Sequence, residues 1–248
     1  MQSGGPFVGT ASWALPREEQ PNFPPDGTHL ERYATRFTAV EINSSFYRPH
    51  RTKTYERWAA SVPEEFRFSV KMPKAITHER RLREADELLD AFVAESGGLG
   101  RKLGCILIQL PPSFVFEHDD IATFLNGLRE RTSVGVVLEP RHRSWASDSV
   151  DDLLTDFRVG RVMADPIRIP GGEDPGGWTN LIYYRLHGSP ETYRSCYSDE
   201  YLEMMAHKIE EDVADGREAW CMFDNTARNF ATTNGLYLLD RLSAGPQP

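Results

Sequence analysis

Apolar positions along the chain fall into two alternating patterns. The first is a set of eight short, mostly continuous apolar runs, which is typical of strands covered on both faces. The second is a recurrence of apolar residues at i, i+3, i+4 and i+7, which predicts helices between the runs. The predicted strands span residues 7–13, 38–46, 66–72, 105–110, 134–139, 161–164, 181–186 and 219–223.

Seven helices are predicted between and after these strands. The first begins at Thr28, where Thr28 and Glu31 form the pattern of a capping box. The others lie around residues 55–62, 82–93, 121–128, 150–157, 201–213 and 236–242. Residues 166–180, PIRIPGGEDPGGWTN, are turn formers throughout, so a loop should replace the crossover helix after the sixth strand.

This alternation predicts an α/β fold, a TIM-type (β/α)8 barrel with eight parallel strands closed on one another. The length of the chain is typical of such a barrel, so residues 1–248 are expected to form a single domain. A doubly wound open sheet is the alternative. That fold would favour a Gly-rich turn after the first strand, and the sequence contains no GxGxxG or P-loop pattern. No nucleotide cofactor is therefore predicted.

Charge and composition exclude several classes of binding partner. The net charge of −9 argues against general binding to nucleic acid or to an acidic membrane, but allows a local basic pocket. No apolar run approaches the ~20 residues of a membrane span, and the first residues do not resemble a signal peptide. Three cysteines without metal spacing fit a reducing compartment. We therefore expect a cytoplasmic protein with a small-molecule ligand; the oligomeric state is not predicted.

Polar residues gather at the carboxyl ends of the predicted strands. In a (β/α)8 barrel these ends meet at one mouth, where active sites lie. The strand ends supply Thr10, Trp13, Glu41, Asn43, Lys71, Gln109, Glu139, Arg141, Asp165, Arg185, His187, Asp224 and Asn225, and the loops after them supply Tyr47, His78, Arg80 and His142. Some of these could instead be ion pairs that fill the interior, such as Glu41 with Lys71 or Glu139 with Arg185.

The leading interpretation is an enzyme that acts on a small anionic or phosphorylated metabolite, with sugar-like compounds included. Glu41 and Glu139 are the candidate general acid and base. The positive groups that would hold the anion, and that would lower the pKa of these carboxyls, are Lys71, Arg141, Arg185 and His187. Replacing Arg141 or Arg185 with alanine is expected to abolish binding of phosphate-bearing ligands without unfolding the protein.

Three alternatives remain open at this stage. A divalent metal could bind Glu139, Asp165 and His187, with Glu41 or Asp224. Glu41 and Glu139 could hydrolyse a glycosidic bond if they lie roughly 5–9.5 Å apart. The barrel could also be non-catalytic and hold a ligand or single-stranded nucleic acid by stacking on the aromatic residues Trp13, Phe46, Tyr47 and Trp145. A serine nucleophile is weakly supported, because no G-x-S-x-G motif is present and no histidine is tied to Ser44 or Ser45.

Seven blocks of the sequence, in order, resemble one known family. They are VGTASW at 8–13, VEINSSFYR at 40–48, FRFSVKMPKAITH at 66–78, QLPPSF at 109–114, LEPRHRSW at 138–145, YRLHG at 184–188 and FDN at 223–225. Together they resemble the YecE-like family, domain of unknown function 72. The resemblance implies a TIM-type barrel of the bacterial or archaeal cytoplasm, with no established activity. Its motif residues coincide with most of the strand-end residues above.

The chain departs from the family pattern at two places. Pro140 stands where an aromatic residue is common, and Arg143 where proline is common. The last strand ends Phe223-Asp224-Asn225-Thr226, where the family tends to have Phe-Asn-Asn-Asp. The second departure affects any metal ligand that the family would share at this strand.

Overall fold

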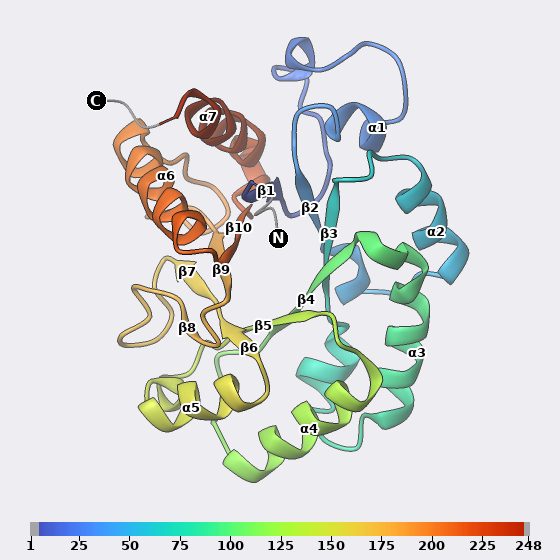
Figure 1. The fold of residues 1–248 in the computed structure, drawn as a ribbon, viewed down its shortest axis with the longest axis vertical. Coiled ribbons are helices and arrows are strands. Elements are labelled where there is room, and N and C mark those ends of the chain that lie inside the picture. Colours follow the sequence, from blue (N-terminus) through green and yellow to red (C-terminus); the bar gives the residue numbers. More distant parts are fainter. Residues whose placement is uncertain (1–4, 246–248) are drawn as a thin grey trace.

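The computed structural model describes residues 5–245 and alternates strands with helices along the chain (Figure 1). The strands are β1 Phe7–Thr10, β2 Ala39–Ile42, β3 Arg67–Lys71, β4 Leu103–Gln109, β5 Gly135–Glu139, β6 Val159–Arg161, β7 Met163–Asp165, β8 Gly176–Gly177, β9 Leu181–Leu186 and β10 Glu218–Phe223. The α-helices are α1 His29–Tyr33, α2 Thr52–Ala60, α3 Asp86–Ser96, α4 His118–Arg131, α5 Asp148–Asp156, α6 Asp199–Ala214 and α7 Phe230–Ala244. The predicted α/β class is confirmed.

The strands form two sheets rather than one uninterrupted ladder. One has the order β1-β10-β9-β7 and the other the order β2-β3-β4-β5-β6-β8. All pairings are parallel except that of β8 with β6. The predicted sixth strand is split between them: β6 pairs with β5, and β7 pairs with β9. The chain therefore passes from one sheet to the other at Val162.

Side chains replace backbone pairing where β1 meets β2. The Val8 N–H donates to Thr38 Oγ1 at 2.8 Å, the Thr10 N–H donates to the Tyr33 hydroxyl at 2.9 Å, and that hydroxyl lies 3.0 Å from the Ala39 carbonyl oxygen. The backbones are so close that a Cβ on Gly9 would lie 2.1 Å from the same oxygen. The continuous ladder predicted for a closed barrel is therefore not formed at this seam.

The two sheets nevertheless enclose a common core. Successive side chains of a strand point to opposite sides, so alternate residues face the space between the sheets. Ala39, Cys105 and Val137 from one sheet pack there with Tyr183 and Trp220 from the other. The helices lie outside the strands, with α2 to α5 beside the larger sheet and α6 and α7 beside the smaller one (Figure 1).

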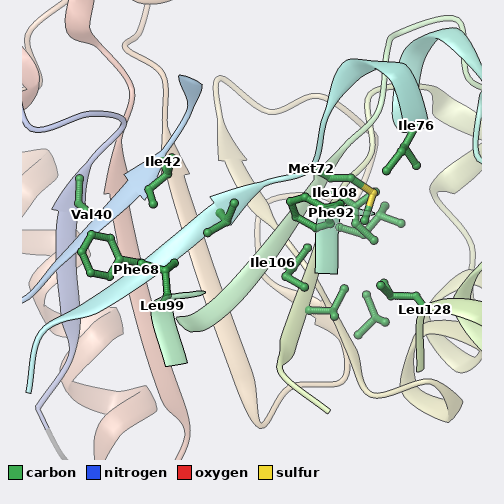
Figure 2. Close-up of a cluster of buried hydrophobic side chains, with 14 of the residues drawn as sticks. Val40, Ile42, Phe68, Met72, Ile76, Phe92, Leu99, Ile106, Ile108 and Leu128 are labelled. Carbon is green, nitrogen blue, oxygen red and sulfur yellow. The ribbon is translucent and has the colours of Figure 1, made fainter. Parts of the chain in front are cut away.

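A second core fills the space between the larger sheet and its helices. Val40, Phe68 and Ile106 alternate in sequence with the inward residues and point outward to this layer, where Phe92 of α3 and Leu128 of α4 meet them (Figure 2). The strands are therefore buried on both faces. This explains why they appear in the sequence as nearly continuous apolar runs.

Two connections between strands differ in how well the sequence predicts them. No helix lies between β7 and β9, a segment that the structure describes completely, so the predicted loop is confirmed. The predicted helix 82–93 begins later, at Asp86, because Arg81, Leu82 and Glu84 have positive φ angles of 53°, 64° and 47°. Within residues 5–245, no helix has both the length and the apolar character needed to cross a membrane.

Candidate active site

Inward-facing residues at the carboxyl ends of the strands form one layer of polar side chains, which we call the mouth layer. Because side chains alternate along a strand, each member lies two residues beyond another inward-facing residue, such as Ala39 below Glu41 or Val137 below Glu139. The mouth layer consists of Glu41, Lys71, Gln109, Glu139, Arg185 and, just past β9 and β10, His187 and Asp224. All seven are buried.

Arg185 lies at the centre of this layer and binds three carboxylates. Its Nε and Nη2 atoms lie 2.9 and 2.7 Å from the two oxygens of Glu41, which is a forked contact. Its Nη1 lies 3.1 Å from Glu139 Oε2, and its Nη2 lies 3.0 Å from Asp224 Oδ2. The Tyr183 hydroxyl, one inward position below Arg185, lies 3.0 Å from Glu41 Oε2. The pairing of Glu139 with Arg185, which the sequence left open as an alternative, is present, and Arg185 has no exposed surface.

His187 joins two of the same carboxylates. Its Nδ1 lies 3.0 Å from Asp224 Oδ2 and its Nε2 lies 3.2 Å from Glu139 Oε1. An imidazole donates to two acceptors at once only when both nitrogens carry protons.

These contacts fix the charge of the carboxylates. Burial opposes ionisation of Glu139, but the positive charges of His187, Arg185 and Arg141 hold the pKa of its carboxyl well below the usual range. Burial likewise opposes ionisation of Asp224, and Arg185 with His187 lowers the pKa of that carboxyl. The predicted direction for Glu139 agrees with this. A carboxylate held ionised in this way serves better as a fixed negative charge than as a proton donor at neutral pH.

Lys71 belongs to the mouth layer but not to this network. It is only 6% exposed, yet its ammonium forms no hydrogen bond and has no carboxylate within 4 Å among residues 5–245. Instead it lies 4.2 Å from the centre of the Phe46 ring. The Glu41–Lys71 ion pair, an alternative that the sequence left open, is therefore not formed, because Arg185 binds both oxygens of Glu41.

Other polar groups at the mouth also lack partners within the described chain. Arg141 donates through Nε to Glu139 Oε1 at 2.9 Å. Its Nη2 is 2.8 Å from the same oxygen, but the angle does not give a hydrogen bond, so this buried donor is unsatisfied. Asn43 Oδ1 is a buried acceptor without a partner, and the amide of Gln109 makes no hydrogen bond to residues 5–245. Such groups are rare in proteins unless water or a ligand satisfies them.

Half-buried His78 and two aromatic rings form the rim on the β2–β3 side. His78 Nδ1 lies 2.8 Å from Thr77 Oγ1, and its ring packs edge-on to Phe46 with centroids 5.0 Å apart. Burial and the charges of Lys71 and Arg141 lower the pKa of His78. Tyr47 is 71% exposed beside Phe46 and is the widely accessible aromatic of this rim.

Several predicted site residues have local roles instead. The Thr10 hydroxyl contacts Tyr33 and the Ser12 carbonyl. His142 accepts from the Ser144 N–H and caps the short helix that follows. Asp165 accepts from the Tyr197 hydroxyl at 2.7 Å. In addition, Asn225 donates to Ser195 and Asn234, and Arg80 is exposed and 3.8 Å from Glu84.

Two of the four candidate stacking residues pack against other side chains of the protein. Trp145 is 1% exposed, and its indole N–H donates to the Phe114 carbonyl at 2.9 Å. Trp13 packs edge-on to Trp58 with ring centroids 5.0 Å apart. Trp145 is therefore unavailable to a ligand, because it fills the space under the loop after β5.

Three features of the site were not predicted. The sequence places Asp224 at a strand end but does not predict its contacts with Arg185 and His187, and it does not predict that Tyr183 reaches Glu41. The period-two spacing Tyr183, Arg185, His187 could have identified Tyr183 as inward-facing. Ser44 Oγ lies 2.8 Å from His50 Nε2, a contact that only the turn after β2 creates.

The carboxylates and imidazoles do not form a metal site in the described part of the chain. No group of three or more His, Cys, Asp or Glu side chains in residues 5–245 is arranged to hold a metal ion. The physical reason is that Arg185 and Arg141 occupy the oxygens of Glu41 and Glu139, while Asp165 is bound to Tyr197. The set of metal ligands that the sequence left open as an alternative is therefore not assembled.

Two hollows lie at opposite ends of the strands. One of about 590 Å³ is lined by Gly104, Gly135 and Leu181 at the amino ends of β4, β5 and β9, which is the end of these strands opposite to the mouth layer. The other, of about 270 Å³, is lined by Trp13, Glu41 and Asn43 at the carboxyl ends. The smaller hollow is lined by Glu41 of the mouth layer and by Asn43, whose Oδ1 is unsatisfied, so it is the better candidate for chemistry.

Comparison with known proteins agrees with the sequence blocks. The family model described as "Protein of unknown function DUF72" matches residues 7–248. The chain belongs to this family. The YecE-like resemblance is thereby confirmed, and the family description names no activity.

Two curated relatives carry related names. The UPF0759 protein YecE of Escherichia coli K12 is 31% identical over 64% of this chain, and the match spans 58% of the E. coli protein. The UPF0759 protein YunF of Bacillus subtilis is 24% identical, with 95% of this chain and 94% of the relative covered. Neither name states an activity.

Solved structures support the fold. A DUF72 family protein of Enterococcus faecalis has a TM-score of 0.81 at 18% identity, covering 97% of this chain and 96% of its own. A DUF72 family protein of Thermotoga maritima has a TM-score of 0.76 at 23% identity, with 97% and 100% covered. A sugar phosphate isomerase/epimerase of Parabacteroides distasonis has a TM-score of 0.55 at 12% identity, with 98% and 95% covered. At these identities the likeness concerns the fold alone.

Proposed function

We propose that the protein is an enzyme that binds a small anionic metabolite at the carboxyl ends of its strands, with Arg141 and Lys71 as the groups that attract the anion. The observation that carries this proposal is the pair of cationic groups with unused hydrogen-bonding capacity. Lys71 has no anionic partner within 4 Å in residues 5–245, and Arg141 has an unsatisfied buried donor. A phosphate or carboxylate between them would satisfy both.

Arg185 has a different part in this proposal from the one expected from the sequence. It is saturated by Glu41, Glu139 and Asp224 and has no exposed surface. It therefore organises the carboxylates below the ligand, and Glu139 in turn orients Arg141 through the Nε contact. Gln109 and Asn43 would supply neutral hydrogen bonds that select among anions.

We further propose that the two sheets are the parts of one (β/α)8 barrel whose ladder is interrupted at two places, where β1 meets β2 and where the sixth strand divides into β6 and β7. The strand order follows the chain, and both sheets share the inner core. Active sites of such barrels lie at the carboxyl ends of the strands. The sugar phosphate isomerase/epimerase provides a precedent for this fold with an anionic substrate, but its name describes that protein only.

A thermal-unfolding screen tests the anion proposal. The wild-type protein is heated with inorganic phosphate, sugar phosphates and small carboxylic acids, each at millimolar concentration. At least one anion should raise the melting temperature, because a ligand at 100 times its Kd stabilises the folded state by about 2.7 kcal/mol. Arg141→Gln should lose this shift.

Arg143→Gln is the matched control, because Arg143 lies two residues away and is exposed. This variant should respond to anions as the wild type does. If no anion stabilises the wild type, or if Arg141→Gln responds as strongly as Arg143→Gln, the proposal is wrong.

A further inference from the structure

The protein contains two poorly exposed lysines with opposite surroundings. The Lys102 ammonium, near the start of β4, donates to the Ala59 carbonyl at 2.8 Å and to the Val62 carbonyl at 2.7 Å. Its role is structural. The Lys71 ammonium at the mouth has neither a carbonyl nor a carboxylate partner in the described chain, although the residue is 6% exposed. No protein oxygen holds this nitrogen in place, so a structural role like that of Lys102 does not explain its position.

The geometry around Lys71 suits a reactive amine. The Phe46 ring, 4.2 Å from the ammonium, covers the side chain, and no ion pair holds the nitrogen. Glu41, Glu139 and Asp224 are the carboxylates that act on it from a distance, and Arg185 is the opposing cation. Arg185 already neutralises these carboxylates through direct contacts, so they stabilise the lysine charge only weakly.

We propose that Lys71 is a nucleophile that forms an imine with the aldehyde or ketone group of an anionic ligand bound at the mouth. This inference rests on the proposed function for the anionic half of the ligand and adds a carbonyl group as its reactive half. Arg141 would hold the anion, and Lys71 would reach the carbonyl carbon.

The chemistry balances without a further reactant. The neutral amine of Lys71 attacks the carbonyl carbon, which forms a C–N bond and moves the π electron pair to oxygen. Proton transfers from nitrogen to oxygen then allow one water molecule to leave as the C=N bond forms. His78 is suited to carry these protons: its ring packs against Phe46 and is not bound to a carboxylate, and its lowered pKa favours the neutral form that accepts a proton.

The protonation of Lys71 agrees with this role. Burial and the charge of Arg185 lower its pKa to about 8, against the pull of Glu41, Glu139 and Asp224 in the other direction. A substantial fraction of the amine is therefore neutral near pH 8, and this is the form that attacks a carbonyl.

Reductive trapping tests the proposal. The protein is incubated with glyoxylate, pyruvate or dihydroxyacetone phosphate in the presence of sodium borohydride, which reduces an imine to a stable secondary amine. Peptide mass spectrometry then locates the adducts. At least one probe should label Lys71 about tenfold faster than exposed Lys74, three residues away, and the rate should rise as the pH passes 8. Equal labelling of Lys71 and Lys74, or labelling only of exposed lysines, would overturn the proposal.

Two variants separate the imine from the anion site. Lys71→Arg keeps the positive charge and should abolish trapping at this position while anions still raise the melting temperature. Arg141→Gln should reduce trapping of dihydroxyacetone phosphate to the level of uncharged dihydroxyacetone. Anion stabilisation of the wild type without trapping at Lys71 would refute the imine alone. Absence of both would refute the proposed function as well.

Discussion

At the scale of single residues, Arg185 and Lys71 are two different solutions to burying a positive charge. Arg185 is surrounded by three carboxylates that satisfy its planar fork, whereas Lys71 has only an aromatic ring beside it. The first arrangement is stable only as a complete set. The second carries a cost in stability that a function at the mouth would explain.

Removing Arg185 should severely destabilise the protein. Arg185→Ala leaves Glu41, Glu139 and Asp224 buried without their shared counter-charge, so we expect the free energy of unfolding to fall by about 3–5 kcal/mol. Urea denaturation measures this loss, and Arg143→Ala should change it by less than about 0.5 kcal/mol. This differs from the expectation based on sequence, in which Arg185→Ala left the fold intact. A loss below about 1 kcal/mol would show that the network is dispensable.

Removing the charge of Lys71 should raise the free energy of unfolding, which is the opposite of the effect expected for Arg185→Ala. In the unfolded chain the pKa of Lys71 is near 10.5, and in the folded protein it is about 8. The unfolded state therefore binds more protons between these values, and the penalty for folding is fully present below pH 8 and absent above pH 10.5. Lys71→Met should gain on the order of 1–3 kcal/mol at pH 7, and the gain should shrink as pH rises to 10. Chemical denaturation at both pH values checks this; a variant less stable than the wild type at pH 7 would contradict it.

The strand-end residues could be predicted from sequence because each follows an apolar run with period-two spacing. The ion-pair partners of these residues could not be predicted. Whether Glu41 meets Lys71 or Arg185 depends on which side chain spans the interior, and only the longer forked guanidinium of Arg185 contacts both Glu41 and Glu139. For the same reason, the burial of Trp145 under the loop after β5 was not evident from its position beside charged residues.

At the scale of secondary-structure elements, Tyr33 of α1 is the residue that joins β1 to β2. Its hydroxyl accepts from the Thr10 N–H and lies 3.0 Å from the Ala39 carbonyl, so one side chain serves two backbone groups that no ladder pairs. Tyr33 has no exposed surface, and stacking on Phe37 at 4.3 Å between ring centroids fixes its ring.

Tyr33→Phe tests this joint. The substitution removes only the hydroxyl and leaves buried polar groups of β1 and β2 without partners, which should cost about 1–3 kcal/mol of unfolding free energy. Hydrogen exchange of the Thr10 amide should also accelerate relative to other amides of β1. Tyr47→Phe, at an exposed tyrosine, is the control and should leave both quantities unchanged. Unaltered stability of Tyr33→Phe would mean that packing alone holds the seam.

Element boundaries were less predictable than element types. Leu82 and Ala85 are buried and fit a helical period, so periodicity places them in a helix. Their burial comes from an irregular turn with positive φ angles, and α3 begins only at Asp86. A hydrophobic pattern reports burial rather than backbone dihedral angles. The split of the sixth strand at Val162 likewise depends on two different neighbours, β5 and β9, that the strand's own sequence does not reveal.

At the scale of the whole molecule, the polar interior links stability to pH. Glu139 and Asp224 both have a pKa below their unfolded values, so their contribution is present above pH ~4.5 and is lost as the pH falls through the folded pKa values. The free energy of unfolding should therefore fall steeply below about pH 4.5.

Asp224→Asn tests the origin of this acid sensitivity. The variant should be less stable than the wild type at pH 7, because Arg185 and His187 lose a charged partner. Its stability should depend less on pH below 4.5. Unfolding free energies from denaturant titrations at pH 3 to 7 provide the measurement, and parallel curves for the two proteins would contradict this account.

The α/β alternation and the missing crossover helix were predictable because each depends on local sequence. Whether the strands close into one continuous ladder could not be predicted. It depends on how β1 and β2, which residues 11–38 separate in sequence, approach each other. Here the contact at Gly9 is so close that Thr38 and Tyr33 side chains take the place of ladder hydrogen bonds.

The central claim is that an anion binds at the mouth between Arg141 and Lys71. The most direct measurement is a crystal structure of the protein soaked with selenate, with the anion located by its anomalous signal. We predict selenate within hydrogen-bonding distance of both Arg141 and Lys71 Nζ, and loss of that signal in Arg141→Gln but not in Arg143→Gln. Selenate bound only at other surfaces, with the mouth empty, would contradict the account.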